Sequence, residues 1–365
     1  MKQRIPAASP DIGEEELRYV TEALKSGWVS SKGPFIEEFE KRFSGYIGAK
    51  HGIATSNGTV ALHLALVALG IGPGDEVLVP SLTFIATANA VTYTGAKPVF
   101  LDSHPDYWCV DPNVVRESIT DRTKAIVLVH LYGHPCDMEP ILEVARSRDL
   151  CVIEDCAEAH GAEYRHKKVG SFGDVSCFSF YGNKTITTGE GGMCVTDHEE
   201  LAQKMRILKD HGMNPKKRFW HDVVGFNYRM TSLQAALGLA QLDKVERLVE
   251  RKRRIAETYR EHLKHTKNMV LAPEMSWAKS TYWFYSVLLD VGLRDNVIAL
   301  LDQEGIETRP FFYPIHILPP YSHGLKLPVA ERLSAAGLSL PSGPRITNEE
   351  IGNVTSALDR ALRLG

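Results

Sequence analysis

A single lysine occupies the segment FSFYGNKTITTGEGG (residues 178–192), in which Glu190 is the only other charged residue. A short apolar run precedes Lys184, and a glycine-rich turn follows it. A lysine shielded from water has a lowered pKa and becomes an amine nucleophile. Such an amine is what a Schiff-base lysine needs. A lysine at a strand end with its amine in solvent fits this segment equally well, so the rest of the chain must decide.

Composition and charge exclude several classes of protein. A chain of 365 residues can bury a large core and is long enough for two domains. Its formal charge of −3, without a polybasic run, argues against nucleic acid or an anionic membrane as the main partner. No apolar run reaches the roughly 18 residues of a membrane span. Residues 1–6 lack the apolar core of a signal peptide.

The cysteines predict free thiols rather than disulfides. Most lie in apolar strand-like runs, as Cys151 and Cys194 do, and no CxxC pair occurs. A chain of this length needs no disulfide framework, so we expect buried thiols in a reducing cytoplasm. His130 and His134 are four residues apart, but a glycine and a proline interrupt any helix there. No metal site is expected.

Short apolar strands alternate with helical patterns through the first two-thirds of the chain. The predicted strands are 51–55, 76–80, 97–102, 124–131, 151–155, 174–180 and 192–196. The predicted helices are 13–26, 34–46, 59–69, 83–94, 138–148 and 199–211. This alternation is typical of an α/β fold with a largely parallel sheet covered on both faces.

The last third has a different pattern. An almost uninterrupted helical pattern runs from Thr231 to about His262 and predicts one long helix linking two domains. A strong strand at 282–290 and helices at 294–304 and 348–362 follow. We therefore predict a large domain over residues 1–245 and a small α+β domain over residues 246–365.

Three further features lie just after predicted strands. Ser56-Asn57-Gly58-Thr59 opens a helix, whose free N–H groups suit a phosphate, although it can also be a simple cap. Asp155 ends a buried strand, where ligands of open α/β sheets bind and where a carboxylate needs a cationic partner. A protonated pyridine nitrogen is such a partner, while a helix or turn cap is the alternative role. Phe84 follows another strand and can stack on a planar ring or pack in the core.

A phosphate cradle, a stacking aromatic, a strand-end aspartate and a sheltered lysine, in this order, are the parts of a pyridoxal phosphate site. At this point the chain resembles the sugar aminotransferases of the DegT/DnrJ/EryC1/StrS family. The resemblance covers nearly the whole chain and rests on GWVS (27–30) with Gly33-Pro34, SNGT (56–59), PSLTF (80–84), EDCAEAHG (154–161), residues 179–192, GFNYRM (225–230), Arg309-Pro310 and PIH (314–316). It implies fold type I of the pyridoxal-phosphate-dependent transferases, the architecture of aspartate aminotransferase.

The resemblance assigns roles residue by residue. Lys184 matches the lysine that binds the cofactor covalently and later moves a proton. Asp155 matches the partner of the pyridine nitrogen, and Phe84 the stacking aromatic. The matches to the phosphate contacts are Ser56, Asn57, Gly58, Thr59 and Ser179. Asn227 matches a residue that reaches the phosphate from the neighbouring subunit, which implies a homodimer with shared active sites.

Two residues of the EDCAEAHG motif call for separate comment. Glu158 departs from the commoner family pattern, in which a glutamine contacts the ring hydroxyl, and a carboxylate there needs a proton between two oxygens. His160 lies near Asp155 in sequence, and we interpret it as a packing residue near the cofactor. A related branch replaces the lysine by histidine and carries out a dehydration, so Lys184 argues for transamination.

The segment 180–192 is especially similar to the perosamine-forming branch of the family. The resemblance implies transfer of an amino group from L-glutamate to C4 of a nucleotide-linked 4-keto-6-deoxyhexose, in particular GDP-4-keto-6-deoxy-D-mannose. Five residues match positions that face the sugar nucleotide: Trp28, Ser30, Arg229, Tyr313 and His316. Each of them could instead have a purely structural role; Arg229, for example, could pair with a carboxylate. Aromatic and cationic groups suit a nucleotide diphosphate.

Two other functions remain open at this point. One is amination at C3, or of a UDP- or dTDP-linked sugar. The other is a non-catalytic regulator of the same fold, against which the intact Lys184 and Asp155 and the lack of a basic face argue. The fate of the product, lipopolysaccharide O-antigen or an antibiotic, is likewise left open by the residues.

Overall fold

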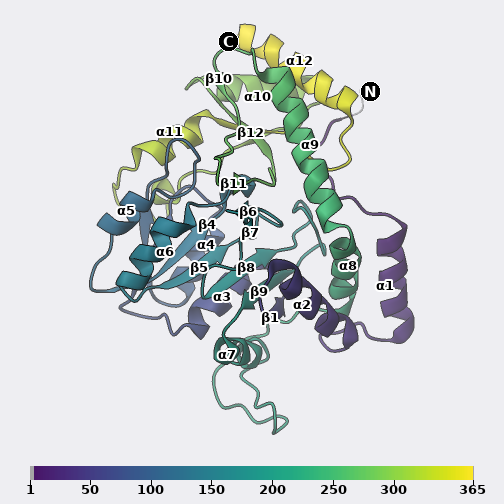
Figure 1. Cartoon of the computed structure of the whole chain (residues 1–365), viewed down its shortest axis with the longest axis vertical. Helices are drawn as coiled ribbons and strands as arrows, with labels where there is room; N and C mark the ends of the chain where they lie inside the picture. The colour runs from purple at the N-terminus through teal and green to yellow at the C-terminus, as the bar shows by residue number, and fades with distance from the viewer. Residues whose placement is uncertain (1–3, 365) are drawn as a thin grey trace.

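A seven-stranded sheet forms the centre of the computed structural model, which describes residues 4–364 (Figure 1). In spatial order the strands are β1 (His51–Thr55), β9 (Gly192–Thr196), β8 (Val175–Ser179), β5 (Cys151–Asp155), β4 (Thr123–Val129), β2 (Glu76–Pro80) and β3 (Lys97–Leu101). Only β9 runs against the other strands of this sheet. The predicted α/β class is therefore confirmed, and all seven predicted strands of this sheet are present.

Helices cover both faces of the sheet because alternate strand residues face opposite layers. In β4, Ala125 and Val127 pack in one core, and Ile126 and Leu128 pack in the other. One layer contains α3 (Gly58–Ala68), α4 (Ala86–Tyr93) and α7 (Glu199–Lys209). The opposite layer contains α2 (Pro34–Ile47), α5 (Pro112–Glu117), α6 (Met138–Ser147) and α8 (Ser232–Asp243). The first helix, α1 (Glu14–Ser26), packs on α8.

The single long helix predicted from Thr231 to His262 is wrong. The chain forms α8 and then α9 (Val245–Leu263), separated at Lys244, whose φ of −118° lies outside the helical range. Side-chain patterns on both sides of Lys244 remain helical, so periodicity alone does not reveal the break. Thr231 does cap α8: its side chain accepts from the N–H of Gln234 in a capping box.

The C-terminal part contains a four-stranded antiparallel sheet, in the order β10 (Met269–Val270), β12 (Tyr285–Leu289), β14 (Gly337–Leu340) and β13 (Arg309–Pro310). Helices α10 (Arg294–Gln303) and α12 (Asn348–Leu364) pack together beside it (Figure 1). Strand β12 and both helices were predicted, whereas β14, at the centre of this sheet, was not. The remaining elements are β6 (Glu163–Tyr164), β7 (Lys167–Lys168), β11 (Ala278–Lys279), α11 (Pro328–Ala336) and two short 3₁₀ turns, 131–133 and 315–317.

Two separate cores meet along α9. Leu248 and Val249 at its start pack in the core of the large sheet, and Ile255 and Tyr259 pack in the core of the C-terminal sheet. The N-terminal segment also reaches the second core, because Ile5 pairs with Ile306. The division of the chain at residue 245 stays a prediction, and we propose that residues around Ile5 belong with the C-terminal unit.

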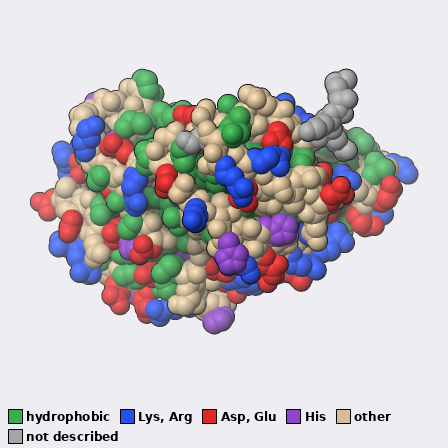
Figure 2. All heavy atoms as spheres, turned by 90° about the horizontal axis from the view of Figure 1, so that it is seen from above, with side chains coloured by type: hydrophobic (Ala, Val, Ile, Leu, Met, Phe, Trp, Pro, Cys, Tyr) green, Lys and Arg blue, Asp and Glu red, His purple; other side chains and the backbone are tan. Residues whose placement is uncertain are grey.

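Positive and negative side chains are interspersed on the face shown in Figure 2, without a large area of one sign. None of the helices within residues 4–364 is both long and apolar enough to cross a membrane.

Candidate active site

A cavity of about 640 Å³ lies at the carboxyl ends of β1, β2, β4, β5 and β8. Eight of the ten residues predicted to hold the cofactor line it: Asn57, Gly58, Thr59, Phe84, Asp155, Glu158, Ser179 and Lys184. These residues come from four separate segments of the chain. Convergence of polar groups and perturbed carboxyls in one cavity is typical of an active site.

Lys184 lies in the turn after β8, where its N–H donates to the carbonyl oxygen of Tyr181 at 2.9 Å. Its Nζ lies 3.7 Å from the centroid of the Trp283 ring. Burial of the amine lowers the pKa of Lys184, and the nearby carboxyls of Glu158 and Asp155 act in the opposite direction. The residue as a whole is half-buried and lines the cavity, which agrees with the sheltered amine predicted from the flanking residues.

Asp155 ends β5 with its carboxyl in the cavity and only 6% of the residue exposed. Oδ2 accepts from the hydroxyl of Thr87 at 2.9 Å, and Oδ1 accepts from the N–H of Ala157 at 3.2 Å. Burial raises the pKa of Asp155, while these two donors and Lys184 partly offset that rise. A cationic ligand group in the cavity would stabilise its ionised form.

Glu158 is buried beside the same amine. Its Oε2 accepts from the backbone N–H of Tyr132 at 2.7 Å. Burial raises the pKa of Glu158 to about 7, although Lys184 and the Tyr132 N–H act to lower it. A protonated Glu158 can donate a hydrogen bond, which is the property that a carboxyl needs in order to replace glutamine opposite an oxygen atom.

The segment 56–59 forms a tight cradle against the end of β8. Asn57 caps α3, with its Oδ1 accepting from the N–H of Val60 at 3.0 Å. A Cβ on Gly58 would lie 2.8 Å from the Cβ of Ser179, so only glycine allows this approach. The start of α3 and the hydroxyl of Ser179 thus border one space, which suits an anion at a helix N-terminus.

Aromatic rings form one wall of the cavity. Phe84 is 55% exposed, and its ring centroid lies 5.9 Å from that of Phe312. Phe312 stacks on Tyr132 with centroids 5.6 Å apart, and Tyr132 stacks on Trp283 with centroids 6.2 Å apart. Phe84 therefore keeps a free ring face beside the cavity instead of packing in the core, which was the alternative for this residue.

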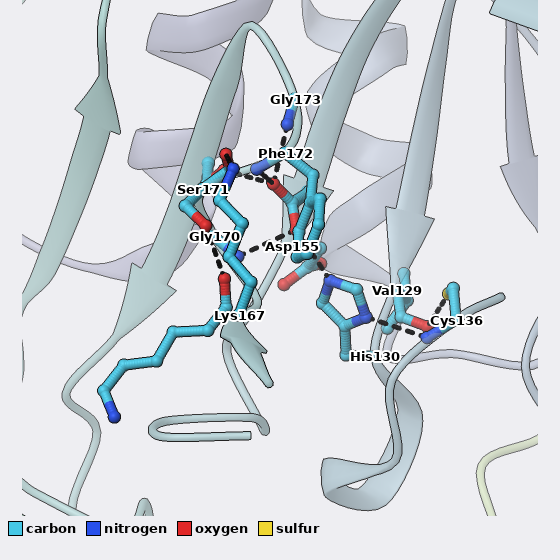
Figure 3. Close-up of polar contacts among 12 residues, drawn as sticks. Val129, His130, Cys136, Asp155, Lys167, Gly170, Ser171, Phe172 and Gly173 are labelled. Carbon is cyan, nitrogen blue, oxygen red and sulfur yellow. Dashed lines mark hydrogen bonds and ion pairs between the residues drawn. The ribbon is translucent and has the colours of Figure 1, made fainter. Parts of the chain in front are cut away.

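A buried hydrogen-bond network supports the strand end that carries Asp155. The carboxylate of the preceding residue, Glu154, accepts from His130, from the N–H groups of Gly170, Phe172 and Gly173, and from the hydroxyl of Ser176. Figure 3 shows four of these donors, His130, Gly170, Phe172 and Gly173, gathered near Asp155. His130 Nδ1 accepts from the N–H of Cys136, so its Nε2 carries the proton given to Glu154. His130, Glu154 and Cys156 are close enough to hold a metal ion, but these hydrogen bonds already occupy the histidine and the carboxylate.

Comparison with known proteins agrees with this geometry. Residues 10–359 match the DegT/DnrJ/EryC1/StrS aminotransferase family. The chain belongs to this family. It is 52% identical over 365 residues to the GDP-perosamine synthase of Caulobacter vibrioides, with 98% of each chain covered.

Two solved structures are also similar to this aminotransferase. The aminotransferase TlmJ of Streptoalloteichus hindustanus has a TM-score of 0.96 at 33% identity, covering 99% of this chain and all of the other. The PLP form of the sugar aminotransferase Spr1654 of Streptococcus pneumoniae has a TM-score of 0.95 at 28% identity, covering 99% of both chains. Both likenesses confirm the predicted fold type.

Two predicted cofactor residues of this aminotransferase do not line the cavity. Ser56 donates its N–H to the carbonyl oxygen of Tyr228 at 2.9 Å. Asn227 is exposed, and its Oδ1 accepts from Nε of Arg229 at 3.1 Å. Asn227 pairs with Asp210 at the end of α7, and the loop between α7 and α8 that leads to it extends beyond the rest of the molecule (Figure 1). Its predicted reach toward a second subunit stays a prediction.

The five residues predicted to face the sugar nucleotide lie outside the cavity of the aminotransferase. Arg229 pairs with Asp210 at 2.7 Å, the alternative considered for it. His316 is buried, with Nδ1 2.7 Å from Ser81 and Nε2 3.1 Å from Glu331, so both ring nitrogens already have partners. The other three are exposed and free for contacts: Trp28, Ser30 and Tyr313.

His160 is fully buried among Phe43, Phe178 and Phe180. Burial, with a smaller contribution from Lys184, lowers the pKa of His160 to about 3. A neutral imidazole in an aromatic cluster agrees with its interpretation as a packing residue.

Sequence reasoning missed Thr87, Tyr132, Trp283 and Phe312. Thr87 follows Phe84 by three residues, a spacing that places both side chains on one face where the helix begins. This spacing could have identified Thr87 from the sequence. No comparable signal marks Trp283 or Phe312, because they reach the cavity from the C-terminal part of the chain.

Proposed function

We propose that this protein transfers the amino group of L-glutamate to C4 of GDP-4-keto-6-deoxy-D-mannose, giving GDP-perosamine, with pyridoxal 5'-phosphate as cofactor. The observation that carries the proposal is Lys184, whose amine shares one cavity with Asp155, Glu158 and the cradle at Gly58. The 52% identity with a GDP-perosamine synthase over 98% of both chains supports the choice of substrate.

The residues of the cavity fit pyridoxal phosphate. Gly58 and Thr59 of the cradle, together with Ser179, suit the phosphate, and the free face of Phe84 suits the ring. Asp155, buried in the cavity with its carboxyl close to Lys184, would hold the pyridine nitrogen in its charged form. When bound, the cofactor supplies an electron sink for the substrate carbon that loses its proton.

Lys184 supplies the nucleophile and the proton carrier. Its lowered pKa keeps part of the amine neutral and so able to attack a carbonyl carbon. Once released, the same amine can take a proton from the substrate carbon and return it elsewhere. Glu158, with a pKa of about 7, can hold a hydrogen bond to a ring oxygen as donor or acceptor as the reaction requires.

We further propose a homodimer in which the partner subunit's Asn227 completes the phosphate site. The loop that leads to Asn227 projects from the molecule, and it exposes apolar side chains: Phe219 is 75% exposed and Val224 is 90% exposed. Exposed apolar residues of this size are typical of a surface that another chain covers.

The six cysteines are all free, which supports a reducing cytoplasm as the place of action. Incorporation of the sugar into lipopolysaccharide O-antigen stays a prediction.

The visible absorption spectrum tests this proposal. Purified protein mixed with pyridoxal phosphate should develop the band of a lysine-bound cofactor, and added L-glutamate should bleach that band. Lys184→Ala should remain folded but lack the band, and its turnover should fall by several orders of magnitude. Unchanged turnover in this variant would contradict the assignment of Lys184 as nucleophile and proton carrier.

The acceptor is tested separately. The glutamate-treated enzyme should recover its original band with GDP-4-keto-6-deoxy-D-mannose and much more slowly with UDP- or dTDP-linked keto-sugars. Recovery with a 3-keto-sugar alone would move the reaction to C3. Absence of any band with the cofactor would instead favour a non-catalytic role for the fold.

A further inference from the structure

Trp283, just before β12, is held by three hydrogen bonds. Its backbone N–H donates to the carbonyl oxygen of Tyr132 at 3.0 Å, and its indole Nε1 donates to the carbonyl oxygen of Asn183 at 2.8 Å. The third contact is made by its carbonyl oxygen, which accepts from Nζ of Lys252 at 2.8 Å. The residue is 5% exposed and lines the cavity. Its ring is therefore held as a rigid surface.

The amine of Lys184 rests on this surface, 3.7 Å from the ring centroid. Two carboxyls, Glu158 and Asp155, also act on the amine, and the charge of Lys184 in turn contributes to the lowered pKa of His160. Glu190 lines the cavity as well. The face of an indole attracts a cation, and the attraction is stronger where water is excluded.

Lys252 is a buried lysine outside the cavity, on α9, with 4% exposure. Besides the carbonyl oxygen of Trp283, its Nζ donates to the carbonyl oxygen of Ser342 at 2.8 Å. Within residues 4–364, burial is the sole cause that shifts its pKa, which falls to about 7, and no carboxylate acts on it. A neutral amine has two N–H donors, the number that these two carbonyl groups take up.

We propose that Trp283 holds the amine of Lys184 on its ring face, and that Lys252 positions Trp283 by tying its backbone to that of Ser342. The proposal rests on the function assigned above to Lys184, and it adds Trp283 as a catalytic residue and Lys252 as a positioning residue. Lys252 thereby links the C-terminal sheet, through Ser342 beyond β14, to the reacting amine.

Trace acetylation of the cofactor-free protein tests this without catalysis. The protein is labelled with a small amount of acetic anhydride over a range of pH, and the peptide that carries Lys184 is quantified by mass spectrometry. The midpoint of the labelling profile reports the pKa of Lys184, and the plateau reports access of the reagent. Lys217, 3.5 Å above the ring of the exposed Trp220, serves as an internal reference in each digest.

Trp283→Leu keeps the amine buried but removes the π face. We expect the midpoint for Lys184 to fall, so that labelling below the midpoint is about three- to tenfold faster than in the wild type. Trp283→Phe keeps a weaker face, so its midpoint should lie between the two; this variant also serves if the leucine variant does not fold. A midpoint in Trp283→Leu that equals or exceeds the wild-type value overturns the role of Trp283.

Lys252→Met tests the positioning step. The two carbonyl groups lose their donor. Labelling of Lys184 should increase by about fivefold, the effect of losing the one hydrogen bond that holds Trp283. Lys204→Met is the matched control, because Lys204 also donates to a backbone carbonyl, that of Ala68 at 2.6 Å, away from the cavity. Equal labelling of Lys184 in the wild type and in Lys252→Met would overturn the role of Lys252.

The assigned function can fail independently of this inference. If the wild type forms no cofactor band but the labelling profiles shift as expected, then Trp283 and Lys252 still control the amine and only the reaction is wrong. If the band forms and the profiles do not shift, the reaction stands and the inference is wrong.

Discussion

The hydroxyl of Thr87 donates to Oδ2 of Asp155 at 2.9 Å, so a residue of α4 orients the carboxyl at the end of β5. The N–H of Ala157 fixes the other oxygen. Each oxygen has one donor from the protein and a remaining lone pair, which leaves the carboxylate ready for a cation in the cavity. The position of the proposed pyridine partner therefore depends on a helix as well as on its own strand.

Thr87→Val should weaken the site without disturbing the fold. Valine keeps the shape of threonine but removes the donor to Asp155, which raises the pKa of Asp155 further and makes its ionised form less stable. We expect turnover to fall by about tenfold, and Asp155→Ala to lower it by several further orders of magnitude. Steady-state kinetics with saturating cofactor measures both changes.

A second threonine on the same helix gives the control. Thr92 donates to the carbonyl oxygen of Ala88 and lies near Tyr321, away from Asp155. Thr92→Val should leave turnover within about twofold of the wild type. Equal losses in the two variants would mean that α4 as a whole, and not the contact with Asp155, matters.

Much of the fold was predictable because the large sheet follows local rules. Strand β5 is apolar on both faces and ends in a carboxylate, and β1 leads directly into the cap of α3 at Asn57. Such strands and their ends are recognisable one segment at a time. Lys184, Asp155 and Gly58 were therefore singled out from the sequence, since each lies at or after the end of its own strand, and the structure brings the three into one cavity.

The features that escaped prediction depend on contacts between distant segments. Strand β14 was missed because its four residues owe their pairing to β12, some 50 positions earlier in the chain. Trp283 reaches the cavity from the C-terminal part of the chain, and Lys252 contacts Trp283 and not the cavity itself. No local pattern distinguishes Lys252 from its solvated neighbours on α9. The break at Lys244 was missed because residues on both sides keep a helical period.

Gly58→Ala should close the phosphate cradle. The added Cβ would lie 2.8 Å from the Cβ of Ser179, so β8 and the start of α3 must separate to make room. We expect affinity for pyridoxal phosphate to fall by at least about tenfold, because the backbone can no longer approach the phosphate closely. Titration of the cofactor absorbance measures the affinity.

Gly352→Ala is the control for this prediction. Gly352 lies in α12 with open space around its Cα, so alanine should fit there and leave cofactor affinity unchanged. If Gly58→Ala binds pyridoxal phosphate as tightly as this control, the start of α3 is not the phosphate site.

Glu158 should make the cofactor-free protein less stable as the pH rises. Its folded pKa of about 7 lies above the ordinary value of 4.5, so the folded state binds this proton more tightly than the unfolded state does. The resulting stabilisation is complete below pH 4.5 and is lost as the pH rises through about 7. Relative to Glu158→Gln, the free energy of unfolding of the wild type should fall by about 1–3 kcal/mol across this window. Urea unfolding at a series of pH values measures the difference, and a constant difference would contradict the prediction.

Glu154, four residues before Glu158, should give the stability of the protein the opposite dependence on pH. Burial acts to raise the pKa of Glu154, but donors from His130, Gly170 and Gly173 outweigh it and lower the pKa below 4.5. Its contribution to stability is therefore present above pH 4.5 and lost as the pH falls through the folded pKa.

In Glu154→Gln, the amide turns a donor toward groups that are themselves donors. We expect a loss of about 3 kcal/mol near neutral pH, with the difference from the wild type shrinking in acid. Glu14→Gln, at an exposed position in the first turn of α1, should change neither quantity. Urea midpoints from pH about 7 down to about 3 decide the matter. A Glu154→Gln protein as stable as Glu14→Gln at neutral pH would show that the network behind Asp155 does not depend on this carboxylate.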